Sequence, residues 1–175
     1  MQFDDIEYLK HGNPRQQRAY TTLSDNKILL ILARFDPILV GTIPINIDVA
    51  NSDLDIICCF SDDADFRRTI SENFGSEKGF RMRERPDANE TSVVANFVCG
   101  DFEIEIFGQN VPTKRQLAYR HMVIEHALLN ARGQEFRKRI VELKRRGLKT
   151  EPAFALALGL TGDPYLALLQ FENSA

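Results

Sequence analysis

The chain has 175 residues and a mass of 20.0 kDa, a size that fits one globular domain or a domain with a small helical annex. Hydrophobic residues make up 43% and charged residues 27% of it, which excludes a wholly disordered, collagen-like or mucin-like chain. The formal net charge of −3 argues against a protein that holds long nucleic acids through a basic field. A small ligand, or a nucleotide together with its metal ion, remains an expected partner.

The predicted elements begin with helices and then change to strands. Residues 6–33 are expected to be helical with a break near residues 12–14, and two apolar strands follow over 36–41 and 53–60, joined by a loop. A helix is predicted over 62–74, strands over 81–85, 91–99 and 102–107, and helices over 114–130, 134–146, 152–158 and 164–171. This order predicts an α+β fold with a short mixed β-sheet flanked by helices, in which residues 1–110 form the core and 111–175 a helical C-terminal lobe packed on it.

The apolar runs, the first residues and the cysteines of the sequence bear on membrane association and on the redox compartment. No apolar run reaches the roughly 18 residues that a membrane span needs, and the acidic first residues do not resemble a secretory signal. The three cysteines are Cys58, Cys59 and Cys99, and the first two are adjacent within an apolar run. This pattern predicts free, buried thiols in a reducing compartment, so we expect a cytoplasmic protein with no membrane association.

Two aspartates mark the start of the second apolar strand. Asp53 and Asp55 are two residues apart, so their side chains share one face of that strand. Adjacent carboxylates repel each other, and Mg²⁺ prefers oxygen ligands and bridges one or two carboxylates to substrate phosphates. Upstream, Gly41 allows a close approach of the backbone to a phosphate, while Thr42 offers a hydroxyl and an N–H.

A further acid–apolar–acid pattern occurs later in the chain. Glu103 and Glu105 share one face of the strand predicted over 102–107. If this strand lies beside the one that carries the aspartates, three acids converge and can hold one or two Mg²⁺ or Mn²⁺ ions. The alternation alone leaves open whether Glu103 or Glu105 is the third acid.

These motifs resemble the polymerase-beta-like nucleotidyltransferase superfamily. The closer resemblance is to an uncharacterised bacterial domain family of that clan, extends over about residues 10 to 169, and rests on Val40–Pro44, Ser52–Ile56, Phe107–Gln109 and Tyr119–His121. It implies a metal-dependent site that transfers a nucleoside monophosphate from a nucleoside triphosphate to a hydroxyl acceptor. The superfamily most often has serine where Thr42 stands and usually starts a helix there, whereas Pro44 and the loop after it interrupt one here.

The resemblance assigns roles to individual residues. Gly41 and Thr42 match the residues that contact the phosphates, and Asp53 and Asp55 match the metal-binding acids. Glu105 matches the third acid and completes the site or acts as general base. Two further residues, Ser52 and Arg120, are candidates for contacts to the nucleotide.

Other functions remain possible from the sequence. A non-catalytic nucleotide- or partner-binding module of the same fold would use the same residues, as would a metal-dependent phosphohydrolase. His121, Glu125 and His126 are reminiscent of a zinc hydrolase helix, but their histidines are five residues apart, whereas zinc hydrolase motifs place two histidines four apart on one face. The nucleotide, the acceptor, catalytic competence and the oligomeric state are left open.

Overall fold

The structure is a computed structural model that describes residues 3–86 and 91–174. Met1 and Gln2, which begin the segment considered for a secretory signal, lie outside the described residues. The chain divides into two compact units: a sheet unit of Met1–Val40 and Asp53–Gln116, and a helical unit of Gly41–Ser52 and Leu117–Ala175. The domain boundary that the sequence predicts at residue 110 stays a prediction.

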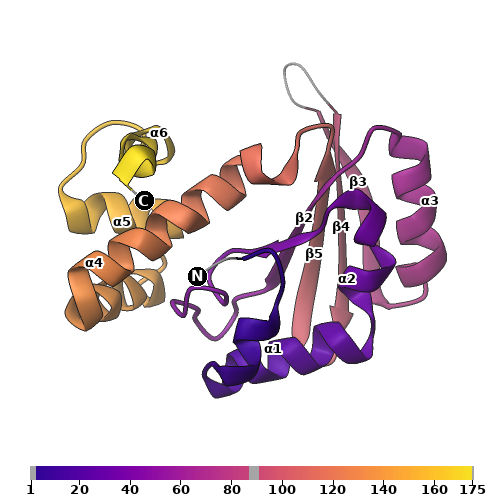
Figure 1. The fold of residues 1–175 in the computed structure, drawn as a ribbon, viewed down its shortest axis with the longest axis horizontal. Coiled ribbons are helices and arrows are strands. Elements are labelled where there is room, and N and C mark those ends of the chain that lie inside the picture. The colour runs from indigo at the N-terminus through magenta and orange to yellow at the C-terminus, as the bar shows by residue number, and fades with distance from the viewer. Residues whose placement is uncertain (1–2, 87–90, 175) are drawn as a thin grey trace. The chain divides into compact units, whose positions relative to one another are not determined.

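The sheet unit contains all five predicted strands (Figure 1). Its elements in chain order are a 3-10 helix (Glu7–His11), α1 (Pro14–Asp25), α2 (Ile28–Ile31), a 3-10 turn (Ala33–Phe35), β1 (Ile38–Val40), β2 (Leu54–Cys59), α3 (Asp63–Phe74), β3 (Lys78–Pro86), β4 (Thr91–Cys99), β5 (Phe102–Gln109) and a 3-10 turn (Thr113–Arg115). The strands β3 and β5 are longer than predicted, and β1 and β2 are shorter.

The strands form one mixed sheet in the order β1-β2-β5-β4-β3. β2 and β5 run parallel, and the other neighbouring pairs are antiparallel. One register row crosses the whole sheet and pairs Val40, Asp55, Glu105, Asn96 and Arg81 in succession. Because directly paired residues point to the same side of a sheet, this row defines a polar face.

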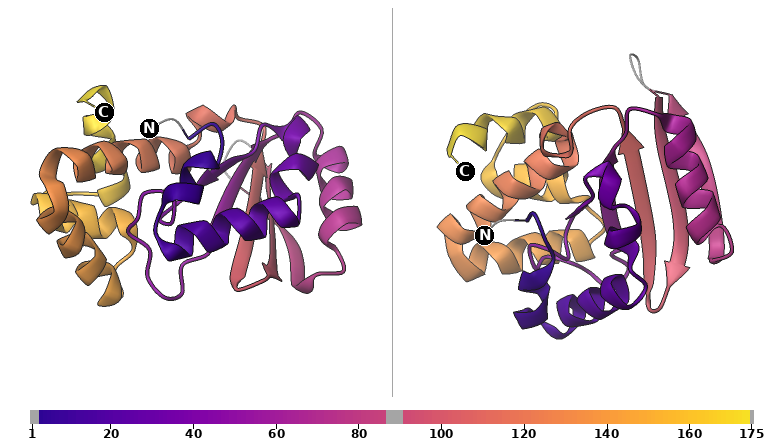
Figure 2. Two further views of the ribbon diagram at one scale, coloured as in Figure 1. Left: turned by 60° about the horizontal axis from the view of Figure 1, so that its bottom comes forward. Right: turned by 45° about the vertical axis from the view of Figure 1, so that its right-hand side comes forward.

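The opposite, apolar face of the sheet carries the core of this unit. Ring contacts from α3 cover it: Phe74 stacks on Phe97 of β4 with ring centroids 4.9 Å apart, and Phe66 lies against Gly108 of β5. From α1, the guanidinium of Arg15 lies 5.4 Å from the centre of the Phe102 ring. The helices α1 and α3 therefore pack on the same face of the sheet, an arrangement that can be followed in Figure 2.

The break predicted before α1 has a clear chemical cause. Asn13 caps the helix by accepting hydrogen bonds from the backbone N–H groups of Arg15 and Gln16, and the Gln16 side chain accepts one from the Asn13 N–H. Pro14 occupies the first turn, as the sequence predicts. The helix then ends at Asp25, since Lys27 adopts a left-handed backbone conformation with φ of 54°.

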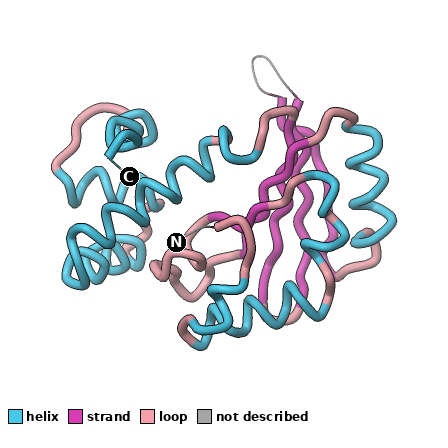
Figure 3. The backbone as a smooth tube through the Cα atoms, viewed as in Figure 1, coloured by secondary structure: helices cyan, strands magenta, loops and turns pink. Residues whose placement is uncertain are grey.

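The helical unit consists of α4 (Leu117–Arg145), α5 (Thr150–Leu158), α6 (Pro164–Leu168) and a 3-10 helix (Leu169–Ser174), together with the loop Gly41–Ser52 (Figure 3). Gly133, with φ of 76°, interrupts the helical conformation inside α4, and the sequence predicts two helices separated at this point. Among the helices of the described residues, none combines the length and the apolar composition that a membrane span requires.

The three cysteines are free, as predicted, but they differ in burial. Cys58 and Cys99 are buried, and burial raises the pKa of both thiols. Cys59 is only half-buried, because it faces the polar side of β2 at the last paired position, opposite Gln109. The prediction of buried thiols therefore fails at Cys59.

Candidate functional site

The parallel pairing of β2 and β5 places two predicted acids side by side. Asp55 pairs directly with Glu105, so both carboxylates lie on the polar face at positions about 4.8 Å apart across the strands. Both residues are half-buried. Glu103 instead pairs with Val98 of β4, and its carboxylate accepts a hydrogen bond of 2.8 Å from Arg81. Of the two glutamates, Glu105 is the one that stands beside Asp55.

A buried amide holds the Glu105 carboxylate. The Asn96 side chain, in a residue that is only 4% exposed, donates a hydrogen bond of 3.0 Å to Oε2 of Glu105 and accepts one of 2.8 Å from Arg83. The guanidinium of Arg83 also lies 3.8 Å from that same Oε2. Sequence reasoning missed both residues, although Asn96 is a lone amide in the middle of an otherwise apolar strand, a signal that could have identified it.

The donor set of this face suits a shared magnesium ion. Asp53 is half-buried and lies directly before β2, two residues from Asp55. Within residues 3–86 and 91–174, no three His, Cys, Asp or Glu side chains gather closely enough to hold a metal ion on their own. Two adjacent carboxylates nevertheless fit Mg²⁺, since this ion is commonly held by one or two carboxylates and completed by substrate phosphates and water.

The loop Gly41–Ser52 brings two other predicted residues together. Gly41 has φ of 86°, a left-handed conformation that favours glycine. The hydroxyl of Thr42 donates to the hydroxyl of Ser52 over 3.2 Å, and the N–H of Val49 donates to the same Ser52 oxygen over 2.9 Å. The two ends of the loop are thereby joined, so Thr42 and Ser52 present adjacent hydroxyls.

An arginine of α4 anchors this loop. The side chains of Ile43, Ile45 and Ile47 are buried, which gives the loop an apolar interior. Arg137 donates hydrogen bonds to the backbone carbonyls of Ile45 and Asn46. Burial lowers the pKa of Arg137, and its carbonyl partners compensate for part of its lost hydration. The loop is thus an ordered part of the helical unit.

Arg120 is held by a carboxylate of the C-terminal 3-10 helix. Its guanidinium makes two hydrogen bonds to the Glu172 carboxylate, of 2.6 and 2.8 Å. This contact raises the pKa of Arg120 and lowers the pKa of Glu172. A contact from Arg120 to a phosphate would first require release from Glu172.

His121 and Glu125 form a buried polar cluster on one face of α4. His121 is buried, with its Nε2 atom 3.0 Å from the Tyr165 carbonyl and its Nδ1 atom 3.6 Å from the Glu151 carboxylate. Glu125, one turn further on, is 3% exposed, and its Oε1 atom has no hydrogen-bond partner among the residues that the structure describes. Burial, followed by the nearby Glu151 charge, raises the pKa of Glu125 well above its usual value, and Lys144 opposes this in part.

The raised pKa of Glu125 predicts a pH-dependent stability. The folded protein keeps the Glu125 proton at pH values where the unfolded chain has lost it, so the free energy of unfolding falls as pH rises above about 4.3, by up to about 1.4 kcal/mol per pH unit. A glutamine cannot ionise. Glu125→Gln is therefore expected to be more stable than the wild type at neutral pH, with a gain that grows from acidic to alkaline pH.

Urea unfolding at several pH values between about 5 and 8 measures this effect. The matched control is Glu135→Gln, which changes an exposed glutamate of the same helix and should leave the pH dependence unaltered. A constant difference between Glu125→Gln and the wild type across this range would contradict a buried, protonated Glu125.

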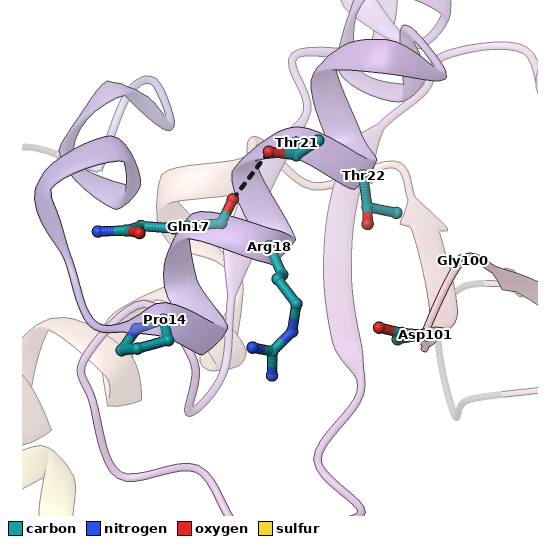
Figure 4. Close-up of a pocket in the computed structure, with 7 residues that line it drawn as sticks. All are labelled: Pro14, Gln17, Arg18, Thr21, Thr22, Gly100 and Asp101. Carbon is teal, nitrogen blue, oxygen red and sulfur yellow. Dashed lines mark hydrogen bonds between the residues drawn. The ribbon is translucent and has the colours of Figure 1, made fainter.

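A separate pocket of the sheet unit contains none of the predicted site residues. It has a volume of about 480 Å³ and is lined by Pro14, Gln17, Arg18, Thr21 and Thr22 of α1 and by Gly100 and Asp101 of the turn between β4 and β5. Figure 4 shows Arg18 and Asp101 reaching into it from opposite walls. Since α1 packs on the apolar face of the sheet, this pocket is distinct from the polar face that carries Asp55 and Glu105.

Comparison with known proteins identifies the family. Residues 21–171 match the model of a family described as "Domain of unknown function (DUF4269)". The chain belongs to the DUF4269 family. No curated protein is similar enough in sequence to this DUF4269 domain to be matched with it.

Solved structures share the fold of this DUF4269 domain. Cid1, described by its RNA terminal uridylyl transferase activity, is similar with a TM-score of 0.55 at 10% identity over 79% of this chain and 45% of its own. The Cid1 poly(U) polymerase with bound MgGTP is similar with a TM-score of 0.53 at 12% identity, over 79% of this chain and 46% of its own. A cytoplasmic RNA terminal U-transferase is similar with a TM-score of 0.53 at 14% identity, over 73% of this chain and 38% of its own.

The DUF4269 domain therefore spans less than half the length of these three chains. At such low identity the likeness establishes the fold alone. The predicted α+β architecture, a mixed sheet flanked by helices with a helical C-terminal region, is confirmed as a nucleotidyltransferase-like fold.

Proposed function

We propose that this DUF4269 domain is a magnesium-dependent nucleotidyltransferase, which transfers a nucleoside monophosphate from a nucleoside triphosphate to a hydroxyl group. The observation that carries the proposal is the direct pairing of Asp55 with Glu105 on parallel neighbouring strands of a nucleotidyltransferase-like sheet. One of the similar structures is described as a complex with MgGTP, which supports a triphosphate with its metal as the ligand. The cytoplasmic location and the bacterial origin expected from the sequence stay predictions.

All of the predicted residues except Arg120, which Glu172 holds, have a role in this proposal. Asp53, Asp55 and Glu105 hold Mg²⁺ or Mn²⁺, while Gly41, Thr42 and Ser52 contact the phosphates. A bound divalent ion would neutralise charge on the triphosphate and favour deprotonation of the attacking hydroxyl. That oxygen forms a bond to the α-phosphorus as the bond to pyrophosphate breaks, and the hydroxyl proton passes to Glu105 as general base.

Pyrophosphate release tests this function directly. The wild-type protein is incubated with each of the four nucleoside triphosphates, Mg²⁺ or Mn²⁺, and pools of hydroxyl-bearing acceptors. We expect metal-dependent pyrophosphate release that is absent from Glu105→Gln. Release of orthophosphate instead would indicate a phosphohydrolase that uses the same acids, and absence of any release with bound triphosphate would contradict the transferase assignment.

A binding module without turnover is the second candidate. The observation that favours it is the guanidinium of Arg83, which lies 3.8 Å from Oε2 of Glu105 and already offers a counter-charge there. A carboxylate that an amide and a guanidinium already hold in place is suited to fix a bound metal–nucleotide without taking part in turnover. This candidate predicts metal-dependent triphosphate binding with no release of pyrophosphate under any acceptor.

A further inference from the structure

A row of basic side chains lies along the edge strand β3, on the polar face of the sheet. Lys78, Arg81, Arg83 and Arg85, here called the basic edge, pair in register with Val98, Asn96, Val94 and Ser92 of β4. These four partners are alternate residues of one strand, so all members of the basic edge point to the same side. That side is the face that carries Asp55 and Glu105.

The basic edge is open to solvent and only partly neutralised. The side chains of Arg81 and Arg83 are 66% and 55% exposed. Arg81 pairs with Glu103 over 2.8 Å, and Arg83 contacts Asn96 and Glu105. The side chains of Lys78 and Arg85 make no hydrogen bond or ion pair with any residue of the described ranges 3–86 and 91–174. Exposed ion pairs such as Arg81–Glu103 are weak, so a stronger anion can replace them.

The spacing of the arginines fits a chain of phosphates. Alternate residues of a strand are about 6.7 Å apart, so Arg81 to Arg85 extends over about 13 Å. A strand stacked as in a duplex, with a rise of about 3.4 Å per nucleotide, carries about four phosphates over that length. One line of cations matches one phosphate chain, whereas a compact anion would engage only part of it.

We propose that the basic edge binds the phosphate backbone of a single-stranded nucleic acid, which is the acceptor of the nucleotidyl transfer. This inference rests on the proposed function and names the acceptor that the function leaves open. The net charge of −3 argues against a general affinity for long nucleic acids, but it is an average over the chain. The register row that starts at Asp55 and Glu105 ends at Arg81, so a strand held on the basic edge lies along the same face as the acids.

Fluorescence anisotropy with a labelled twelve-nucleotide oligouridine, measured over a series of salt concentrations, tests the basic edge. The test variant is Lys78→Gln/Arg85→Gln, since these two side chains have no hydrogen-bond or ion-pair partner to lose among residues 3–86 and 91–174. The control is Arg145→Gln/Lys149→Gln, which removes the same charge from exposed positions of the helical unit. We expect the slope of log affinity against log salt to fall in magnitude by about 1.4 in the test variant and to be unchanged in the control.

The outcomes separate this inference from the proposed function. Equal slopes in the two variants, or no binding of the oligonucleotide by the wild type at low salt, would refute nucleic acid binding by the basic edge. Binding of a labelled triphosphate in the same protein would still support the transferase site. Binding of the oligonucleotide without binding of any metal–triphosphate would refute the proposed function but still support nucleic acid binding by the basic edge. Equal affinity for a duplex of the same length would contradict the assignment to a single strand.

Discussion

Asp55→Asn is expected to weaken metal-dependent triphosphate binding by about 100-fold or more, which corresponds to about 2.7 kcal/mol. The substitution leaves Glu105 as the single carboxylate of the pair, and a neutral amide is a poor ligand for a hard divalent ion. The fold should be retained, because Asp55 is half-buried and asparagine has the same shape. Glu105→Gln should have a similar effect on binding.

Thermal shift measures this result without knowledge of the acceptor. A ligand at a hundredfold excess over its dissociation constant stabilises the native state by about 2.7 kcal/mol, so the wild type should melt at a higher temperature with metal and triphosphate together. Asp25→Asn, which removes an exposed aspartate at the end of α1, serves as the charge-matched control. If Asp55→Asn keeps the full increase in melting temperature, Asp55 does not bind the metal–triphosphate.

Phe66→Ala should produce the largest loss of stability, of about 3–5 kcal/mol. The Phe66 side chain is 0% exposed, and its ring meets Phe35 edge-to-face at 4.9 Å and lies 5.1 Å from the Phe60 ring. Its truncation leaves a cavity where α3 meets the apolar face of the sheet. Gly108 lies directly against the Phe66 ring, since a Cβ atom placed at this glycine would be 2.3 Å from the ring.

Gly108→Ala should therefore destabilise the fold by about 1–3 kcal/mol through overpacking. The double variant Gly108→Ala/Phe66→Leu tests the cause, because a smaller side chain at Phe66 makes room for the new methyl group. Urea unfolding of both single variants and the double variant forms a double-mutant cycle. If the two losses simply add, the proposed clash between Gly108→Ala and the Phe66 ring is wrong.

Local patterns were enough to predict most elements of this fold. The alternation around Glu103 and Glu105 and the apolar run after Asp53 each identify a strand from a few consecutive residues. The acids were found for the same reason, because their spacing along one strand is a local property. The pairing of Asp55 with Glu105 is a different matter, since fifty residues of sequence separate them and no local signal fixes the register between strands.

Partners from distant segments account for what the sequence could not reveal. Nothing near Arg120 in the chain points to Glu172 as the residue that holds it. Nothing near Pro44 indicates that Arg137 orders the loop through its backbone carbonyls. In both cases the partner lies more than fifty residues away, and its choice depends on tertiary packing rather than on propensity.

The loop Gly41–Ser52 constrains how this protein can be dissected for experiments. The chain leaves the sheet unit after Val40 and returns at Asp53, so a fragment that ends at Gln116 would keep the loop and lose Arg137. Three isoleucines, Ile43, Ile45 and Ile47, would then be exposed to water. Such an apolar patch invites self-association. Truncation after the sheet unit should therefore give an aggregating fragment, and a soluble sheet unit would need the loop replaced by a short polar connection.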